Sequence, residues 1–313
     1  MTDPTTVAVR TVASLDRAQL EDVRGLHAAA VAADGHESLG DAVWRDLADP
    51  ASAGPHAEVV ATDRDRLVGF AHVATGDGAR ATRDAEIGLV VHPDARDREV
   101  AAALLDAAVD AARAQHATSA TWWRIGADDS SDAVATRTGF RPSRDLHRME
   151  VLLPLGQEPR WPDGVDVRTF VPGRDDDGWL AVNNAAFAGH PEQGGWTHAT
   201  LERRMREPWF DPKGFVVAFD ERGLAGFCWT KIHADGVGEI YVIGVDPSRQ
   251  GRGLGRPLVV AGLQSLAARG VTTGMLYVDA ANDAAVSLYR SLGFRTVRVD
   301  RAYERDLHDG ASR

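Results

Sequence analysis

Cysteine is almost absent from this sequence, which has only Cys228 among its 313 residues. A single cysteine cannot form an internal disulfide framework, and this scarcity is typical of a protein from a reducing compartment. Cys228 lies in the apolar run 224–229, and no base can be assigned to it. We therefore interpret it as a small buried hydrophobic residue and not as a nucleophile.

Long apolar runs and a basic leader segment are missing as well. No stretch of about 18 consecutive apolar residues occurs. The first residues do not form the basic and then apolar pattern of a signal peptide. We therefore expect a cytoplasmic protein that has no membrane segment.

Positive charge is in deficit, because 46 acidic residues against 35 basic ones give a formal net charge of -11. This balance argues against nucleic acid or an anionic membrane as the main partner. Any polyanionic ligand must then be held by local geometry. The 11 histidines form no H-x-x-x-H pair and no Cys/His cluster, so we expect no metal.

What the sequence does contain is enough apolar material, 44% of its residues, for more than one core. A repeat organises this material. At an offset of 154 residues, Pro93 matches Pro247 and Phe140 matches Phe294. In both halves a turn, a helical pattern, a short strand and a second helix lie between these positions. Each half is predicted to be one copy of the same α/β unit.

The segment 154–164 is dense in proline and glycine, which interrupt helices and strands. It is predicted to be a linker, so the domains are residues 1–155 and 156–313. Strands alternate with helices in both halves, which predicts in each a mixed sheet covered by helices.

The second half contains a glycine-rich loop between an apolar strand at 239–245 and a helical pattern at 256–268. The loop region comprises Gln250, Gly251, Arg252, Gly253, Leu254, Gly255 and Arg256. Glycines let backbone N–H groups turn towards a phosphate, and a helix N-terminus adds the positive end of its dipole. The loop is predicted to bind a pyrophosphate. No Lys-Ser or Lys-Thr pair closes it as in a P-loop, and its spacing is not the G-x-G-x-x-G of a Rossmann motif.

A second motif points to a family. Residues 282–294 resemble the N-x-x-A-x-x-x-Y-x-x-x-G-F helix of GNAT acetyltransferases, and residues 250–255 match their Q/R-x-x-G-x-G/A loop. Asn282 is a candidate N-cap, and Tyr289 lies two turns further along the same helix face. The resemblance implies an α/β fold of two tandem GNAT domains, each a mixed, mostly antiparallel sheet flanked by helices, with acetyl-CoA as co-substrate. Without this motif, Tyr289 would be interpreted as a core aromatic residue.

Acetyl transfer from a thioester to an amine needs a neutral amine, a stabilised carbonyl oxygen and a proton for the leaving thiolate. Glu239, at the start of the strand before the loop, can accept a proton directly or through water. It could equally be a solvated carboxylate at a strand end. Backbone N–H groups near Ile243 and Gly244 can polarise the carbonyl, and Tyr289 can donate to the CoA sulfur. No acyl-enzyme is required.

A longer resemblance narrows the acceptor. The stretch 182–196, together with 209–212, 226–231 and 238–247, is similar to the mycothiol synthases. These tandem GNAT enzymes acetylate the cysteinyl amine of Cys-GlcN-Ins. The similarity covers most of residues 165–305 well and the first half weakly. It implies a small-molecule amine acceptor, and we expect a monomer.

The resemblance also implies site residues. The acceptor contacts fall on Asp41, Glu192, Lys231, Glu239 and Tyr277, of which Asp41 stands where the family has Glu. The acetyl-CoA contacts fall on Ile243, Gly244 and Val245, on the loop residues 250–256, and on Asn282, Asp283, Ala284, Ala285, Val286 and Ser287. Taken singly, Glu192 and Lys231 would be interpreted as solvated surface charges.

The first half lacks these features. Gly251 and Gly253 are matched there by Asp97 and Glu99, and the candidate base and acid are matched by alanines. Side chains and negative charge would stand where a pyrophosphate has to approach the backbone. We expect the first half to be non-catalytic, to support the second half and to supply Asp41. The resemblance leaves its strand residues Leu89, Val90 and Val91 as weak candidates for cofactor contacts.

Two alternatives stay open. The protein could be a GNAT enzyme for another amine, such as a peptide N-terminus or an aminoglycoside. It could also be a non-catalytic sensor of acetyl-CoA, which the intact loop and Tyr289 argue against. Turnover of acetyl-CoA separates the sensor from an enzyme.

Overall fold

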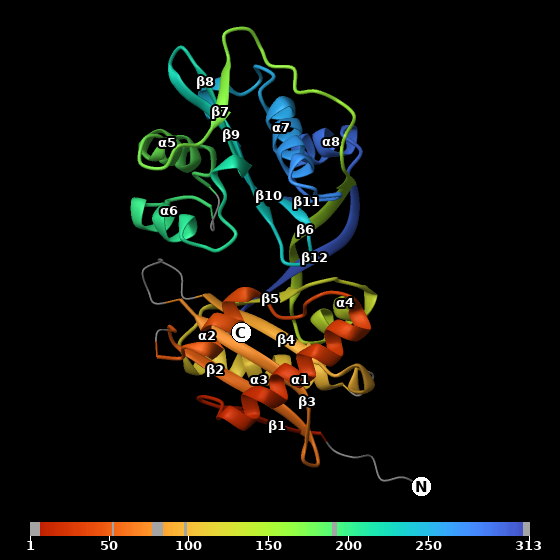
Figure 1. Cartoon of the computed structure of the whole chain (residues 1–313). Helices are drawn as coiled ribbons and strands as arrows, with labels where there is room; N and C mark the ends of the chain where they lie inside the picture. Colours follow the sequence, from red (N-terminus) through yellow and green to blue (C-terminus); the bar gives the residue numbers. More distant parts are fainter. Residues whose placement is uncertain (1–6, 52, 77–83, 97–98, 190–192, 309–313) are drawn as a thin grey trace. The chain divides into compact units, whose positions relative to one another are not determined.

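The computed structural model describes residues 7–51, 53–76, 84–96, 99–189 and 193–308. The chain divides into two compact units (Figure 1). Unit 1 consists of residues 1–146 together with 298–313, and unit 2 of residues 147–297. The predicted boundary near residue 155 follows the sequence repeat, whereas these units follow contacts, so the boundary between the repeated halves stays a prediction.

Unit 1 is built on a mixed sheet with the strand order β1-β2-β3-β4-β5-β12. Neighbouring strands in this order are antiparallel, except that β4 and β5 are parallel. The strands are β1 (Ala8–Val12), β2 (His56–Asp63), β3 (Arg66–Thr75), β4 (Asp84–Val91), β5 (Ser119–Arg124) and β12 (Arg295–Asp306), with β6 (Arg141–Leu152) next to β12.

Helices cover both faces of this sheet. On one face, α1 (Arg17–Asp34) and α2 (Asp41–Ala48) pack on a cluster that includes Val60, Phe70 and Val90. On the other face, α3 (Val100–Ala114) and α4 (Asp129–Arg137) join the larger core cluster.

The last strand of the chain completes unit 1. Residues 301–306 of β12 pair with β5, and Tyr303 stacks on Trp122 with ring centroids 5.0 Å apart. Arg301 holds Asp145 through two hydrogen bonds of 2.6 and 2.7 Å and also contacts Asp132 at 2.8 Å. A bidentate pair of this kind fixes geometry as well as charge. Unit 1 therefore depends on residues far away in the sequence.

Unit 2 repeats the arrangement. Its strand order is β6-β11-β10-β9-β8-β7, with β10 and β11 parallel. The strands after β6 are β7 (Asp166–Thr169), β8 (Phe215–Asp220), β9 (Gly223–Ile232), β10 (Gly238–Val245) and β11 (Thr273–Asp279). The helices are α5 (Asp176–Ala186), α6 (His198–Met205), α7 (Gly255–Ala268) and α8 (Asp283–Ser291). An aromatic cluster lies under α5 and α6, and an aliphatic one under α7 and α8.

These observations confirm the predicted fold class, since each unit has a mixed, mostly antiparallel sheet flanked by helices. The predicted helix at 256–268 is α7, and the predicted linker 154–164 contains neither helix nor strand. Cys228 is fully buried, and burial raises the pKa of its thiol to about 12, which confirms it as a core residue.

The two units differ at one matched pair of core positions. In unit 2, β8 and β9 pair Phe215 with Trp229, whose rings stack 4.5 Å apart. In unit 1 the corresponding strands β2 and β3 pair Glu58 with His72, and both residues are buried. His72 Nδ1 lies 3.0 Å from Glu58 Oε1, and Nε2 lies 3.3 Å from Asp46 Oδ2 on α2. A buried carboxylate–imidazole pair, joined by the half-buried Asp46, thus replaces an aromatic stack.

Protonation of His72 is tied to this group. Burial disfavours the imidazolium, but the hydrogen bonds and charges of Glu58 and Asp46 outweigh it, so the pKa of His72 lies above its ordinary value. The stabilisation that this shift brings is fully present below about pH 6.5, the pKa of histidine in an unfolded chain. It is lost as the pH rises through the raised pKa of the folded state.

Unit 1 should therefore become less stable as the pH rises from 6 to 9. Urea unfolding at several pH values measures this slope. The double change Glu58→Phe and His72→Trp copies the pair of unit 2 and should flatten it, whereas His198→Gln, at an exposed histidine, should leave it unchanged. The same slope in the folded double variant would contradict a role for His72.

Candidate active site

Strand β10 carries a bulge that its counterpart β4 lacks. The partners of Ile240 and Val242 in β9 are the consecutive residues Thr230 and Trp229, so Tyr241 is the extra residue. Tyr241 and Val242 accordingly both join the aromatic cluster. The pairing of β4 with β3 runs without interruption from Ala85 to Val91. A bulge bends its strand and disturbs the hydrogen-bond ladder at that point.

β10 also parts from its neighbour β11. The two strands pair only at Gly238 with Gly274 and at Glu239 with Met275. From residue 240 to 245, β10 has no partner residue in β11. Backbone polar groups require partners, and an extended ligand that contains amide groups can supply them. The two strands lie side by side in Figure 1.

The glycine loop follows β10 after a short 3-10 turn, Pro247–Arg249. Gly251 and Gly253 have φ angles of +75° and +82°, in the left-handed region that glycine adopts without strain. α7 begins at Gly255, its N-cap Leu254 makes no side-chain cap hydrogen bond, and its first turn has no acidic residue. Its first N–H groups and the positive end of its dipole are thus suited to an anion. The Leu254 side chain lies in the core, so only its backbone can contribute.

A buried arginine supports the turn between β10 and the loop. Arg249 Nε lies 3.3 Å from Asp220 Oδ2 at the end of β8, and Arg249 also forms an ion pair with Asp246. The Arg249 hydrogen bond holds the pKa of Asp220 below its usual range. The exposed Arg252 lies 3.5 Å from the same carboxylate.

The candidate base Glu239 is buried at the last position where β10 pairs with β11. Its Oε2 lies 2.8 Å from Nε2 of His233, a residue that the sequence analysis did not select. Lys231 is the cross-strand partner of Glu239, yet its Nζ lies 5.3 Å from the centroid of the Trp209 ring and forms no ion pair with Glu239. The register of the β9–β10 hairpin is the signal for His233, because it places His233 next to the pairs that Glu239 and Gly238 form with β9.

Aromatic and charged side chains surround the bulge. The Tyr241 ring lies 5.0 Å from Trp209 and 5.5 Å from Trp229. Burial raises the pKa of Tyr241, and Arg204 of α6 opposes this shift. The sequence analysis also missed Tyr241, because a bulge has no local sequence signal of its own.

The candidate acid Tyr289 is a buried residue of α8 in the aliphatic core cluster, with its ring 5.6 Å from Phe294. Among the described residues its hydroxyl has no hydrogen-bond partner. Burial, and after it the nearby Cys228, raises the pKa of Tyr289, so the phenol is protonated at neutral pH. The Tyr289 hydroxyl can therefore donate its proton to a ligand without breaking a hydrogen bond to the described part of the chain.

The remaining candidates are scattered. Tyr277 is 39% exposed and lies two residues after Met275, the partner of Glu239, so it shares the Glu239 face of the sheet. Asp41 is the exposed first residue of α2 in unit 1. Glu192 lies outside the described residues.

The start of α8 agrees with its predicted cap. Asn282 Oδ1 accepts a hydrogen bond from the Ala285 N–H at 3.1 Å, which confirms Asn282 as the N-cap. Asp283, Ala284 and Ser287 are exposed, whereas the Val286 side chain is buried in the core. Ile243 and Val245 pack partly against the same core. An added Cβ at Gly244 would come within 2.9 Å of the Phe227 ring, so packing also requires this glycine.

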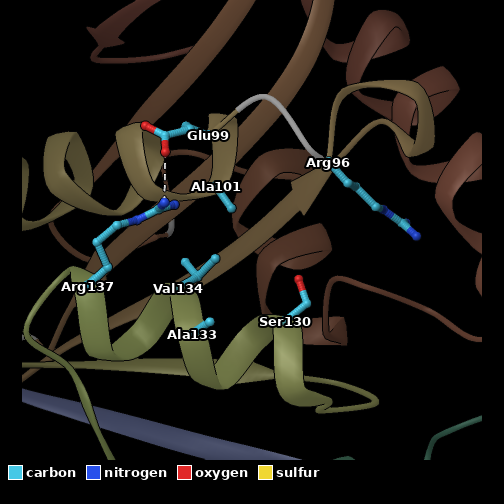
Figure 2. A pocket seen from close by; sticks show the side chains of 7 residues that line it. All are labelled: Arg96, Glu99, Ala101, Ser130, Ala133, Val134 and Arg137. Carbon is cyan, nitrogen blue, oxygen red and sulfur yellow. Dashed lines mark hydrogen bonds and ion pairs between the residues drawn. The ribbon is translucent and has the colours of Figure 1, made fainter.

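The matching region of unit 1 is a pocket of about 220 Å³ at the start of α3 (Figure 2). Glu99 is the N-cap of α3 with φ +60°, the same left-handed conformation as Gly253. Its carboxylate is paired with Arg137 at 2.8 Å. Asp97 lies outside the described residues. Negative charge therefore already occupies the position that is open in unit 2.

The strand candidates of unit 1 are core residues. Leu89, Val90 and Val91 pair with β3 and are all buried. β4 pairs with β5 only as far as Ile87, so backbone groups of these three residues are what a ligand could reach.

Within the described ranges, no group of three or more His, Cys, Asp or Glu side chains is arranged to hold a metal ion. No helix in the same part of the chain is long and apolar enough to cross a membrane.

A duplicated mixed sheet, a bulged strand and a glycine loop at a helix start define an acyltransferase of the GNAT class. The sequence model of the acetyltransferase (GNAT) family matches residues 21–140 and 179–294. A GCN5-related N-acetyltransferase from Sphaerobacter thermophilus has the same fold, with a TM-score of 0.74 at 23% identity over 100% of this chain and 99% of that one. A tandem GNAT protein from the clavulanic acid biosynthesis pathway has a TM-score of 0.72 at 19% identity, over 98% and 100%.

Relatives with higher identity are more specific. A mycothiol acetyltransferase of Thermobispora bispora is 43% identical over 91% of this chain and 95% of its own length. That of Streptomyces griseus is 43% identical over 94% of both. The chain belongs to the mycothiol acetyltransferase family of GNAT enzymes. It is an acetyl-CoA-dependent N-acetyltransferase.

Gly253→Glu should weaken acetyl-CoA binding at least roughly tenfold, about 1.4 kcal/mol, because a carboxylate would stand beside the pyrophosphate. Calorimetric titration measures the affinity. Glu99 adopts the same conformation, so the variant should fold. Gly270→Glu is the matched control, since Gly270 is exposed with φ +81° at the other end of α7. Equal affinities in both variants would refute the assignment of the loop.

Titration of the whole protein should give one tight acetyl-CoA site per chain, in unit 2, because Glu99 and its ion pair disfavour a phosphate in unit 1. Two equivalent tight sites would show that Glu99 does not close unit 1. No tight site at all would contradict the assignment of the loop in unit 2.

Proposed function

We propose that this enzyme transfers the acetyl group of acetyl-CoA to the cysteinyl amine of Cys-GlcN-Ins, the last step of mycothiol biosynthesis, and releases mycothiol and CoA. Family membership at 43% identity over nearly the full length supports the acceptor. The observation that carries the chemistry is the buried Glu239 at the point where β10 parts from β11. A carboxylate at that point is available to an amine that meets a thioester between the strands.

In this proposal acetyl-CoA lies along the free edge of β10, with backbone contacts from Ile243, Gly244 and Val245. The pyrophosphate lies on the loop 250–256 and the uncapped start of α7. The exposed residues at the start of α8 complete the binding surface. In unit 1, Leu89, Val90 and Val91 offer only backbone contacts, because their side chains are buried.

Glu239 takes a proton from the acceptor ammonium, directly or through a water. An α-amine has an ordinary pKa of about 7.7 to 8.0, so a weak base suffices near neutral pH. The neutral nitrogen attacks the thioester carbon, and backbone N–H groups near Ile243 and Gly244 stabilise the oxygen as it gains charge. The C–S bond breaks as Tyr289 donates its proton to the departing sulfur. The nitrogen loses its second proton to solvent as the amide forms, and the Tyr289 phenolate regains a proton from solvent. The transfer is direct and needs no acyl-enzyme.

The acceptor lies on the Glu239 face of unit 2. Lys231 and Tyr277 share that face and offer a cation and a hydroxyl group to a polyhydroxylated inositol-sugar. Trp209, which the Lys231 ammonium faces, adds an aromatic surface. The family resemblance adds Glu192 as a further proposed contact. A cytoplasmic monomer is the proposed state of the enzyme, and the buried, unpaired Cys228 agrees with a reducing compartment.

The acceptor has two nucleophiles, an amine and a thiol, and the product should be the amide with a free thiol. Orientation near the thioester carbon, within about 3 to 3.5 Å, selects the nitrogen. Incubation with acetyl-CoA and Cys-GlcN-Ins, followed by product mass and thiol titration, tests this. An aminoglycoside and a peptide N-terminus serve as control amines. Release of CoA with a control amine but not with Cys-GlcN-Ins would refute the proposed acceptor, and no release with any amine would favour a sensor.

A further inference from the structure

Glu239 is held by one side chain that no feature of the sequence singled out. His233 Nε2 lies 2.8 Å from Glu239 Oε2, and the exposed fractions of the two side chains are 30% and 11%. The imidazole therefore connects a nearly buried carboxylate with solvent. Only one carboxylate oxygen is engaged by this contact.

The backbone around His233 is fixed. His233 N–H donates to the Val237 carbonyl at 2.9 Å, and Gly236 N–H donates to the His233 carbonyl at 2.9 Å. The Asp235 side chain accepts from the Val237 N–H at 3.1 Å within the same turn. The turn 233–237 of the β9–β10 hairpin ends two residues before Glu239, so its fixed backbone determines where the imidazole lies.

We infer that His233 is a positioning residue for acetyl transfer: its Nε2–H donates to Glu239 Oε2 and keeps Oε1 directed to the acceptor amine. This inference rests on the proposed role of Glu239 as the base. A base must lie within hydrogen-bond reach of the proton that it removes, and a misplacement of about 1 Å can cost roughly 100-fold in rate. Lys231, the other basic neighbour, is turned to Trp209 and does not hold the carboxylate.

The test compares His233→Ala, His233→Gln and Glu239→Gln with the wild type in acetyl-CoA turnover with Cys-GlcN-Ins. His233→Ala should lower kcat about 10- to 100-fold and leave the KM for acetyl-CoA unchanged. His233→Gln places an amide N–H near the same position, so it should recover most of kcat. His198→Gln is the matched control, because His198 pairs with Asp177 at the same 2.8 Å distance on an exposed surface.

The split between kcat and KM, together with the recovery by glutamine, separates positioning from support of the fold. Wild-type kcat in His233→Ala would overturn the inference. A loss of kcat that glutamine does not recover would overturn it as well, because it would indicate a structural role. If the wild type does not acetylate Cys-GlcN-Ins, the proposed function fails, and the same variants assayed with the accepted amine still test His233.

Discussion

The parting of β10 from β11 after Glu239 is the constraint on which the rest of the site depends. Two paired residues join the strands, and the bulge at Tyr241 then turns β10 away from a regular ladder. Backbone groups that a sheet would satisfy are left to a ligand. The same strand leads into the loop with Gly251 and Gly253 and then into the uncapped start of α7. One irregular strand thus carries the proposed base and the proposed thioester position, and it leads to the proposed phosphate site.

Duplication produced two units with the same sheet and different chemistry. In unit 2 the core beside the bulge is aromatic and contains the Phe215–Trp229 stack. In unit 1 the matched positions hold Glu58 and His72, β4 has no bulge, and Glu99 stands in place of a glycine. These differences lie in side chains, one loop and one strand irregularity, and the sheet topology is retained.

Charge is used locally in this acidic protein. With a net charge of -11, a polyanionic substrate is not attracted by the molecule as a whole. The helix dipole and free N–H groups of α7 act over a few ångströms, where such interactions are strongest. Glu239 is likewise held by a local contact, the 2.8 Å hydrogen bond from His233.

The sequence by itself determined the local features, since they depend on residues close together in the chain. These include α7, the Asn282 cap, the buried Cys228 and the repeat that predicted two mixed sheets. Tertiary structure decided what depends on pairing between distant segments. Only strand register reveals the bulge, the contact of His233 with Glu239, the turn of Lys231 to Trp209, and the completion of unit 1 by β12. Register is set by the packing of whole faces and by turn geometry, and a linear motif carries neither.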